Sequence, residues 1–266
     1  YAVEDGMRAQ LIDNVTGFYL GHIQITAASF QQEYDPKYSI AHPSAVAEIL
    51  SQDREIKAFS GRIETPAFLN SSSGSLGVLL TGIDPGSETK VTRLSQVIQS
   101  GKFLEAGDDQ SIILGKSLAE KLDLSLDDRV VATVSCLDGT LVQECFRVKG
   151  IIRTGSESLD RGLAFITLQS AQRMLSLGER ITTFVLAVTD PSRIGHVQTN
   201  VRQKLRAFPF EIKSWHDLSP ILIQTIGLFD FILYLIGNIV FVIITVGVAN
   251  TIMITVVERN REIGIL

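Results

Sequence analysis

The tripeptide Gly115-Lys116-Ser117 has the spacing of the end of a phosphate-binding loop. Such a loop also needs a glycine five residues before this tripeptide, where its backbone makes a tight turn. Position 110 is glutamine, and the intervening residues 111–114 have the apolar, β-branched character of a strand. We therefore interpret the segment as a strand that leads into a helix, and we expect no nucleotide or other cofactor.

Residues that could catalyse hydrolysis or hold a metal are dispersed along the chain. None of the four histidines lies in an HExxH or CxxC pattern. Glu157 and Asp160 are close together, but an acidic pair in a Gly/Ser-containing loop is typical of solvated surface with a role in a turn or interface. We expect no catalytic residue and no metal ligand, so an enzyme would require distant residues to converge in space. The four histidines are His22, His42, His196 and His216.

The two cysteines lie in a predicted hairpin. Asp138-Gly139 favours a tight two-residue turn between two alternating strands. In that register Cys136 faces Leu141 and Cys145 faces Ala132, so the thiols lie roughly 13 Å apart along the ladder. A disulfide needs Cα atoms within about 7 Å. We expect two free, buried thiols.

An apolar run near the C-terminus, Phe231–Val257, contains 27 residues and no formal charge. As a helix it would be about 40 Å long, which exceeds a hydrocarbon core of about 30 Å even when tilted. The run therefore predicts a transmembrane helix. Within it, Asn238, Gly247 and Asn250 are candidates for intramembrane contacts, because small and amide side chains allow close approach and hydrogen bonding between membrane helices.

Charged residues follow the apolar run directly, as Glu258-Arg259-Asn260-Arg261-Glu262. A second apolar turn, Ile263-Gly264-Ile265-Leu266, comes next. A simple stop-transfer anchor needs only its two arginines. A short amphipathic helix that docks on another protein also needs the apolar turn, so we predict docking for this segment.

The charges around the run predict its orientation. Arg259 and Arg261 follow it and Asp230 precedes it, so the C-terminus is expected in the cytoplasm and residues 1–230 outside. Tyr1 is neither an initiator methionine nor the start of a signal peptide. Because so large a domain cannot cross a membrane unaided, we expect a hydrophobic segment upstream.

Composition limits the class of protein. With 266 residues and 45% hydrophobic content, the chain can bury a large core and is not disordered. Its net charge is −5, and its 24 lysines and arginines do not gather into a basic stripe. This composition disfavours nucleic acid as a partner.

Hydrophobic periodicity predicts an α+β fold. Apolar residues every three to four positions predict an amphipathic stalk helix that ends near Gly21 and a second one from Trp215 toward the membrane. From position 101 the elements become short and β-rich, and a β-α-β-α-β series begins near 163. The expected strands are 22–26, 56–68, 77–83, 111–114, 130–137, 140–152, 163–166, 181–188 and 210–213, and the expected helices are 43–50, 117–122, 168–177 and 191–205.

A series of short landmarks runs along nearly the whole chain. In order, they are Gly82-Ile83-Asp84-Pro85, Ile113-Leu114-Gly115 with Leu118-Ala119, Val148–Ile152, Leu159-Asp160 leading to Phe165-Ile166, Ala171-Gln172, Trp215 with Leu218 and Pro220, Gly247–Met253 and Val257–Leu266. These landmarks resemble the MacB/FtsX/LolC-LolE family of ABC transporter permeases, and the last two are similar to the second membrane helix and the coupling helix of that family.

The resemblance implies a four-helix permease whose large periplasmic domain lies between membrane helices one and two, so this chain would hold that domain and helix two. The implied parts are a stalk helix at 1–20, a discontinuous Porter-type α+β domain at 21–101 and 161–213, a Sabre-type β-rich insertion at 102–160, a second stalk helix at 214–230, the transmembrane helix at 231–257 and a cytoplasmic coupling segment at 258–266.

The resemblance also implies a noncatalytic subunit in the bacterial inner membrane. Its partners would be a cytoplasmic ABC ATPase dimer, a second permease subunit in a homo- or heterodimer, membrane lipid and, in the LolC/LolE branch, a lipoprotein substrate and a periplasmic carrier. The implied ATPase-coupling residues are Glu258, Arg259, Asn260, Arg261, Glu262, Ile263 and Gly264.

Two departures from the family pattern leave its branch open. Asp127-Asp128 stands where relatives often have Gly-Asp, and Lys149 stands where a second valine is common. Lipoprotein release, peptide or macrolide export and control of cell-wall hydrolases all use this architecture. A single-pass membrane-anchored binding or sensor module without an ATPase is the alternative from another class.

Overall fold

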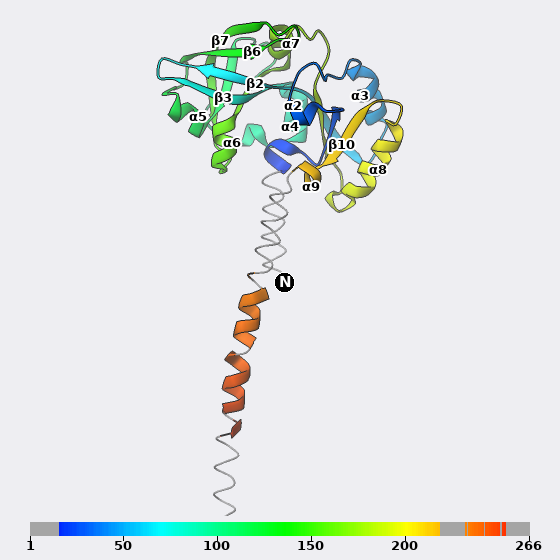
Figure 1. Ribbon diagram of the computed structural model, residues 1–266, viewed down its shortest axis with the longest axis vertical. Coiled ribbons are helices and arrows are strands. Elements are labelled where there is room, and N and C mark those ends of the chain that lie inside the picture. The colour runs from blue at the N-terminus through cyan, green and yellow to red at the C-terminus, as the bar shows by residue number, and fades with distance from the viewer. Residues whose placement is uncertain (1–15, 219–231, 233, 242, 251, 254–266) are drawn as a thin grey trace, which may run out of the picture. The chain divides into compact units, whose positions relative to one another are not determined.

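The computed structural model describes residues 16–218, 232, 234–241, 243–250 and 252–253. The chain divides into two compact units, residues 1–218 and 219–266, and each is considered by itself. The described part of the first unit is a mixed α/β domain (Figure 1). The described part of the second unit is helical.

The domain is organised around one mixed sheet, and nearly all of its strand pairs are antiparallel. Only β3 with β8 and β5 with β7 pair in parallel among the described strands. The strands are β1 (Ile23–Ala27), β2 (Ile56–Asn70), β3 (Ser75–Ile83), β4 (Ile98–Gly101), β5 (Ser111–Gly115), β6 (Arg129–Ser135), β7 (Leu141–Ile152), β8 (Leu163–Thr167), β9 (Thr183–Val188) and β10 (Phe210–Ser214).

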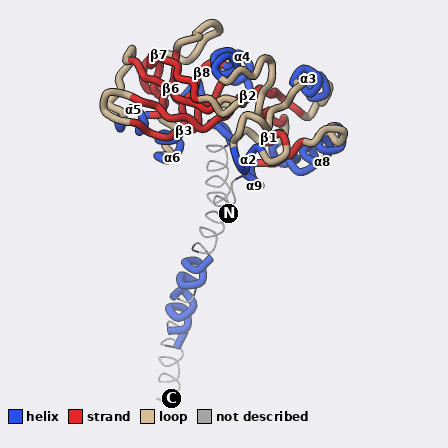
Figure 2. Tube along the Cα trace, turned by 45° about the horizontal axis from the view of Figure 1, so that its top comes forward, coloured by secondary structure: helices blue, strands red, loops and turns tan. Residues whose placement is uncertain are grey.

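Short helices lie around this sheet, with α5 and α6 toward one end and α3 and α8 toward the other (Figure 2). A single π-helical turn, η1, precedes β1. The helices are η1 (Thr16–Leu20), α2 (Phe30–Glu33), α3 (Pro43–Ser51), α4 (Pro85–Val91), α5 (Lys116–Lys121), α6 (Glu157–Gly162), α7 (Leu168–Met174), α8 (Ile194–Lys204) and α9 (Trp215–Leu218), with 3₁₀ turns η2 (Leu94–Val97) and η3 (Pro191–Arg193).

The long strand β2 joins the two ends of the sheet. Its first half pairs with β9 and its last four residues pair with β6, while β3 covers its other edge from Arg62 onward. Pro66 lies where the neighbour changes from β9 to β6. Proline has no N–H to donate, so this gap in the ladder accommodates it without loss of a hydrogen bond.

Strands β9 and β8, which flank the central β2–β3 pair of the sheet, are covered on both faces. Every residue of β8 and β9 is buried. Strands covered on both faces read as continuous apolar runs, and Leu163–Ile166 and Phe184–Val188 have this character. These central strands belong to the core that holds the more polar margins of the sheet in place.

The expected α+β order is confirmed in outline, including the β2–β3 hairpin and the series from β8 to β10. The strands of the β-rich stretch join the same sheet as the rest, through β5 with β8 and β6 with β2. Five short elements were not predicted: α2, α4, η2, β4 and α6. Each spans seven residues or fewer, too short for a clear period.

The predicted register of the β6–β7 hairpin is wrong by one residue. Ser135 pairs with Leu141, because the turn is a three-residue loop and not a two-residue one. The Gly139 N–H donates to the Cys136 carbonyl (3.0 Å), and the Cys136 N–H donates to the Thr140 carbonyl (2.8 Å). Gly139 has φ +78°, the left-handed conformation that closes such a loop.

The cysteines are free, as expected, but the prediction that both are buried is wrong. Cys136 is half-buried and Cys145 is exposed. Cys145 alternates along β7 with the buried Phe146, so its side chain lies on the outer face of the sheet.

Within the second unit, residues 232, 234–241, 243–250 and 252–253 are helical. The Asn238 amide donates to the Tyr234 carbonyl (2.8 Å), a bond along its own helix. Gly247 and the exposed Asn250 lie in the stretch 243–250. None of the helices among the described residues combines the length and the hydropathy required to cross a membrane.

Candidate functional site

The chain enters and leaves the domain at two adjacent places, which we name the N-terminal junction (residues 16–22) and the C-terminal junction (residues 214–218). Strand β1 pairs with β10, with Ile23 opposite Ser214. The Trp215 N–H donates to the His22 carbonyl (3.1 Å). Figure 1 accordingly shows η1 and α9 at the same margin of the sheet. A displacement of either junction would therefore reach neighbouring strands.

The carbonyl groups at the end of η1, in the N-terminal junction, lack partners within their own helix and need hydrogen-bond donors from elsewhere. The Arg93 N–H donates to the Gly17 carbonyl (2.7 Å), and the Gln24 amide donates to that of Leu20 (3.0 Å). Between them, the Arg62 guanidinium donates to the Tyr19 carbonyl (2.7 Å). The cation also suits the negative end of a helix dipole.

Arg62 is part of a buried ionic cluster. Its side chain and that of Glu88 on α4 are both fully buried, and two guanidinium nitrogens donate to the two Glu88 oxygens (2.5 and 3.1 Å). The Thr92 hydroxyl donates to the same carboxylate (2.8 Å). Burial works to lower the pKa of Arg62, but the Glu88 carboxylate more than offsets it and raises that pKa. Arg62 therefore stays charged at any pH at which the fold exists.

Tyr19 adds a second link between the junction and β2. Its hydroxyl donates to Glu64 (2.5 Å), and the Thr183 hydroxyl donates to the other Glu64 oxygen (3.0 Å). The Tyr19 ring also lies 4.9 Å from the Arg62 guanidinium carbon, a cation–π distance. Burial, together with the charge of Glu64, raises the pKa of Tyr19 well above its usual range, so the phenol remains a donor.

The C-terminal junction is held by a capping box. Asp217, in the first turn of α9, accepts hydrogen bonds from the Ser214 N–H (2.9 Å) and the Ser214 hydroxyl (3.0 Å). The Gln198 amide of α8 donates to the same carboxylate (2.9 Å). Partial burial works to raise the pKa of Asp217, but these bonds more than offset it and hold the pKa below its usual range.

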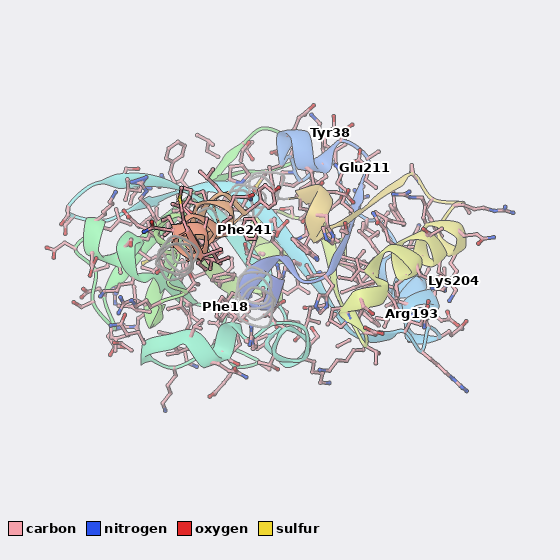
Figure 3. The ribbon with its side chains drawn as sticks, turned by 90° about the horizontal axis from the view of Figure 1, so that it is seen from below. Phe18, Tyr38, Arg193, Lys204, Glu211 and Phe241 are labelled. Carbon is pink, nitrogen blue, oxygen red and sulfur yellow. The ribbon has the colours of Figure 1, made fainter. Side chains whose placement is uncertain are left out.

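Trp215 packs beneath this capping box. The indole is 4% exposed and belongs to the main apolar core. The ring of His216 stacks on it at 3.7 Å between centroids. Aromatic burial and an exposed carboxylate therefore hold the C-terminal junction, in contrast to the buried charges at the other one. Two further charged side chains labelled in Figure 3 form ion pairs: Arg193 at the end of η3 with Glu55 (2.8 Å), and Lys204 at the end of α8 with Asp53 (2.9 Å).

The outer face of β3, β2 and β6 forms a separate feature, an open groove of about 740 Å³. Its described lining carries no charged side chain, and it includes Tyr34, Pro66, Phe68, Leu79, Thr133 and Leu141. Phe68 is 60% exposed and Leu141 is 73% exposed. Large apolar side chains exposed together are typical of surfaces that contact other molecules.

The candidate sites considered from the sequence fall in different places. Gly115 ends β5 and precedes α5, as expected, and a Cβ there would lie 2.1 Å from the Asp160 carbonyl oxygen, so Gly115 is packed closely against the backbone of α6. The prediction that Asp160 is solvated is wrong: it is 5% exposed. It serves the turn, because its carboxylate accepts from the Thr154 N–H and hydroxyl (2.8 and 2.7 Å).

The histidines stay apart, and no group of three or more His, Cys, Asp or Glu among the described residues is arranged to hold a metal. His22 accepts from the Val188 N–H (3.0 Å), and His196 lies 3.2 Å from Glu55. The predicted coupling residues, Glu258 to Gly264, lie outside the described residues. The structure describes Asn238, Gly247 and Asn250, but it describes no neighbouring helix that they could contact. Their predicted intramembrane contacts therefore stay a prediction.

The sequence interpretation missed the junction residues. Arg62 and Glu64 alternate within residues 58–69, where every other residue is apolar or small, and two charges on one face of a core strand signal a buried ionic cluster. The spacing Ser214-x-x-Asp217 is a capping-box signature. Both signals can be found in the sequence, but no local pattern shows which residues of other elements are the partners of these side chains.

Together, the mixed sheet, the paired chain junctions and the apolar segment that follows define a domain of the type found in the extracytoplasmic part of ABC permeases. The chain belongs to the family with a MacB-like periplasmic core domain, which matches residues 2–204. This confirms the resemblance found in the sequence.

Among curated proteins, the chain is 24% identical to LolC, the lipoprotein-releasing system transmembrane protein of Xylella fastidiosa, over 100% of this chain and 63% of the relative. It is 22% identical to LolC of Neisseria meningitidis (79% of this chain, 52% of the relative) and 21% identical to LolE of Haemophilus influenzae (86% and 56%). The chain therefore spans about half to two thirds of the length of these relatives.

Two solved structures share the fold. The periplasmic region of MacB from Actinobacillus actinomycetemcomitans matches with a TM-score of 0.51 at 15% identity, covering 82% of this chain and 98% of that one. The extracellular domain of the noncanonical ABC-type transporter YknZ from Gram-positive bacteria matches with a TM-score of 0.52 at 14% identity, covering 72% and 99%. At this identity the likeness concerns the fold alone.

Proposed function

We propose that this chain is part of a permease subunit of a mechanotransmitting ABC transporter that releases lipoproteins from the bacterial inner membrane. One observation carries the proposal. The similarity to the Xylella fastidiosa LolC protein extends over all of this chain, whereas the core-domain family ends at residue 204. The likeness therefore includes the apolar run, the charged segment and the apolar turn 263–266. An anchored domain without an ATPase would need the run and its flanking charges, but not that turn.

The membrane part of the proposal rests on residues 231–257. Their run without charge is long enough for a bilayer. The described residues of this run are helical and expose large apolar side chains, among them Tyr234, Phe241 and Met253. A helix that is apolar all round is either deeply buried or lies in lipid. Asn238, Gly247 and Asn250 would then contact neighbouring helices.

In the proposed mechanism the subunit itself is noncatalytic. A cytoplasmic ATPase dimer hydrolyses ATP and moves the coupling segment, residues 258–266. The movement passes through the membrane helix and the stalks to the periplasmic domain, which is divided into the Porter-type and Sabre-type parts given above. A second permease subunit completes the complex, and a periplasmic carrier receives the lipoprotein.

The test is copurification of an ATPase with the full-length parent protein in detergent. We compare the wild type with the triple variant Glu258→Ala/Arg259→Ala/Glu262→Ala. The wild type should retain the ATPase and the variant should lose it, because these charges flank the docking face. A matched control, Glu120→Ala/Lys121→Ala/Asp123→Ala, removes three exposed charges next to α5 and should retain the ATPase.

Absence of any ATPase from the wild type would refute the permease proposal and favour a single-pass binding or sensor module. Retention of the ATPase by the triple variant would refute only the assignment of the coupling residues.

A second candidate is a MacB-like exporter of peptides or macrolides, because the family model that matches residues 2–204 is that of the MacB-like periplasmic core domain. ATPase stimulation separates the two. A LolC/LolE-like complex in nanodiscs should hydrolyse ATP faster with a triacylated lipoprotein and should not respond to a macrolide, whereas an exporter should show the reverse.

A further inference from the structure

Helix η1 reaches the domain as a helix end whose carbonyl groups are satisfied by three different donors. One of these donors, the Gln24 amide, is a local partner, and a second is the backbone N–H of Arg93, just before η2. The third is Arg62, a side chain from the sheet itself that is 43 residues away in sequence from the carbonyl it binds. Arg62 is therefore a direct link between the entering chain and β2.

The guanidinium of Arg62 connects three elements at once. One edge binds both oxygens of Glu88 on α4, and a further nitrogen binds the Tyr19 carbonyl of η1. The Tyr19 ring covers the same group. Arg62 and Glu88 are 0% exposed and Tyr19 is 8% exposed, so water cannot replace these bonds without opening the domain.

We propose that Arg62 is a positioning residue that clamps η1 to β2 and α4, so that these three elements move as one body when the entering stalk is displaced. This inference rests on the proposed function, because it names the joint through which the stalk would move the domain. The described contacts of the C-terminal junction include no such buried ion pair: they are the surface carboxylate of Asp217 with its donors, aromatic packing and the backbone bond from Trp215 to His22.

The chemistry of the clamp requires arginine. A planar guanidinium can bind a carboxylate through two donors and still direct another donor at a carbonyl. A lysine ammonium keeps the charge but is a point group on a flexible stem, and it cannot hold both partners in a fixed geometry. In Arg62→Lys, the lysine should therefore still balance the charge of the Glu88 carboxylate, but it should no longer hold the Tyr19 carbonyl.

The first experiment is hydrogen exchange measured by mass spectrometry on the full chain in detergent. The variants are Arg62→Lys and Arg62→Met. The matched control is Arg173→Met, which removes an arginine that is 53% exposed and pairs with Asp109 at 3.1 Å. In Arg62→Lys, amides of residues 17–20 should exchange at least about tenfold faster, while those of β9 should stay within twofold of the wild type. Arg173→Met should change neither.

Two results would overturn the clamp. One is unchanged exchange of residues 17–20 in Arg62→Lys, which would show that the other contacts suffice. The other is equal acceleration of β9 and of residues 17–20 in both Arg62 variants, which would show that Arg62 supports the whole fold and has no particular role at the junction.

A second readout uses the full-length complex with its ATPase. Arg62→Lys should keep ATP hydrolysis within twofold of the wild type and reduce lipoprotein release per ATP at least about fivefold, because the stalk moves without the domain. Equal release per ATP would overturn the coupling role. If no ATPase copurifies at all, the proposed function fails, but the exchange result still decides whether Arg62 clamps η1.

Discussion

The two junctions lie side by side at one margin of the sheet, and they are held by opposite kinds of interaction. At the N-terminal junction Arg62, Glu64 and Glu88 are all buried, and the chain is fixed through charges that have no access to water. At the C-terminal junction Asp217 is exposed and Trp215 carries the packing. Buried charges are costly to separate, whereas an exposed cap exchanges its bonds with water readily.

The comparison indicates that the two junctions have different mechanical roles. A joint that must transmit displacement needs bonds that do not yield, which a desolvated guanidinium–carboxylate pair provides once it is formed. A joint that must tolerate rotation is served by a cap and an aromatic contact. The predictions below test this difference, beginning with the strongest effect.

The largest expected effect is that of Arg62→Met on stability. The variant leaves the Glu88 carboxylate buried without a cation, which should lower the free energy of unfolding by about 3–5 kcal/mol. Urea unfolding followed by fluorescence of Trp215, the single tryptophan, measures it. The double variant Arg62→Met/Glu88→Leu should recover part of the loss, since it removes the buried ion pair but leaves the buried Glu64 carboxylate without the guanidinium that lies 3.9 Å from it. A double variant no more stable than the single one would mean that the unpaired Glu88 charge is not the source of the cost.

Tyr19→Phe should have the next largest effect. It removes one donor from the buried Glu64 carboxylate, so the free energy of unfolding should fall by about 1.5–3 kcal/mol. Tyr38→Phe is the matched control, because the Tyr38 hydroxyl lies 3.3 Å from Glu33 at an exposed site. Equal effects of the two substitutions would remove the distinction between a buried and an exposed tyrosine contact.

Alkaline pH should act on the same residue. The folded pKa of Tyr19 is raised, so its contribution to stability is fully present below the unfolded pKa of about 10 and declines as pH rises above it. The stability difference between wild type and Tyr19→Phe should therefore shrink from pH 9 to pH 11. A difference that is constant over this range would show that the phenol ionises with equal ease in both states.

The sequence predicted the sheet better than the junctions, and the reason is the range of the interactions. Strands such as 163–167 and 183–188 are long apolar runs whose pattern is local. The partners of Arg62 and Glu64 lie 26 and 119 residues away, so no local pattern identifies them. The register of the β6–β7 hairpin failed for a related reason: Asp138-Gly139 is compatible with turns of two and three residues.

Other features needed the family resemblance or lie beyond the described residues. The apolar run and the charged segment gave the membrane and coupling predictions, which stay predictions here. Asp160 looked like surface because its loop is polar, yet packing of α6 against α5 and β5 buries it. Burial of a single carboxylate depends on such tertiary contacts, which composition does not encode.

Asp217→Asn tests the weaker junction at neutral pH. The amide oxygen can still accept one bond from Ser214 but lacks the charge that the capping box uses, and the site is exposed, so the loss should be about 0.5–1 kcal/mol. Urea unfolding at pH 7 checks it. A loss as large as that of Arg62→Met would overturn the contrast between the two junctions.

The smallest effect should be the acid response of the C-terminal junction. The folded pKa of Asp217 is depressed, so its contribution is present above the unfolded pKa of about 3.9 and is lost as pH falls through the folded pKa. The difference between wild type and Asp217→Asn should thus be constant from pH 5 to pH 8, begin to decline near pH 4 and vanish only below the folded pKa. The Tyr19→Phe difference should persist at that acid pH wherever the domain is still folded, because a phenol with a raised pKa holds its proton there. The N-terminal junction would then weaken at alkaline pH and the C-terminal junction at acid pH. If acid changed the stability difference of both variants in the same way, the two junctions would titrate as a single unit.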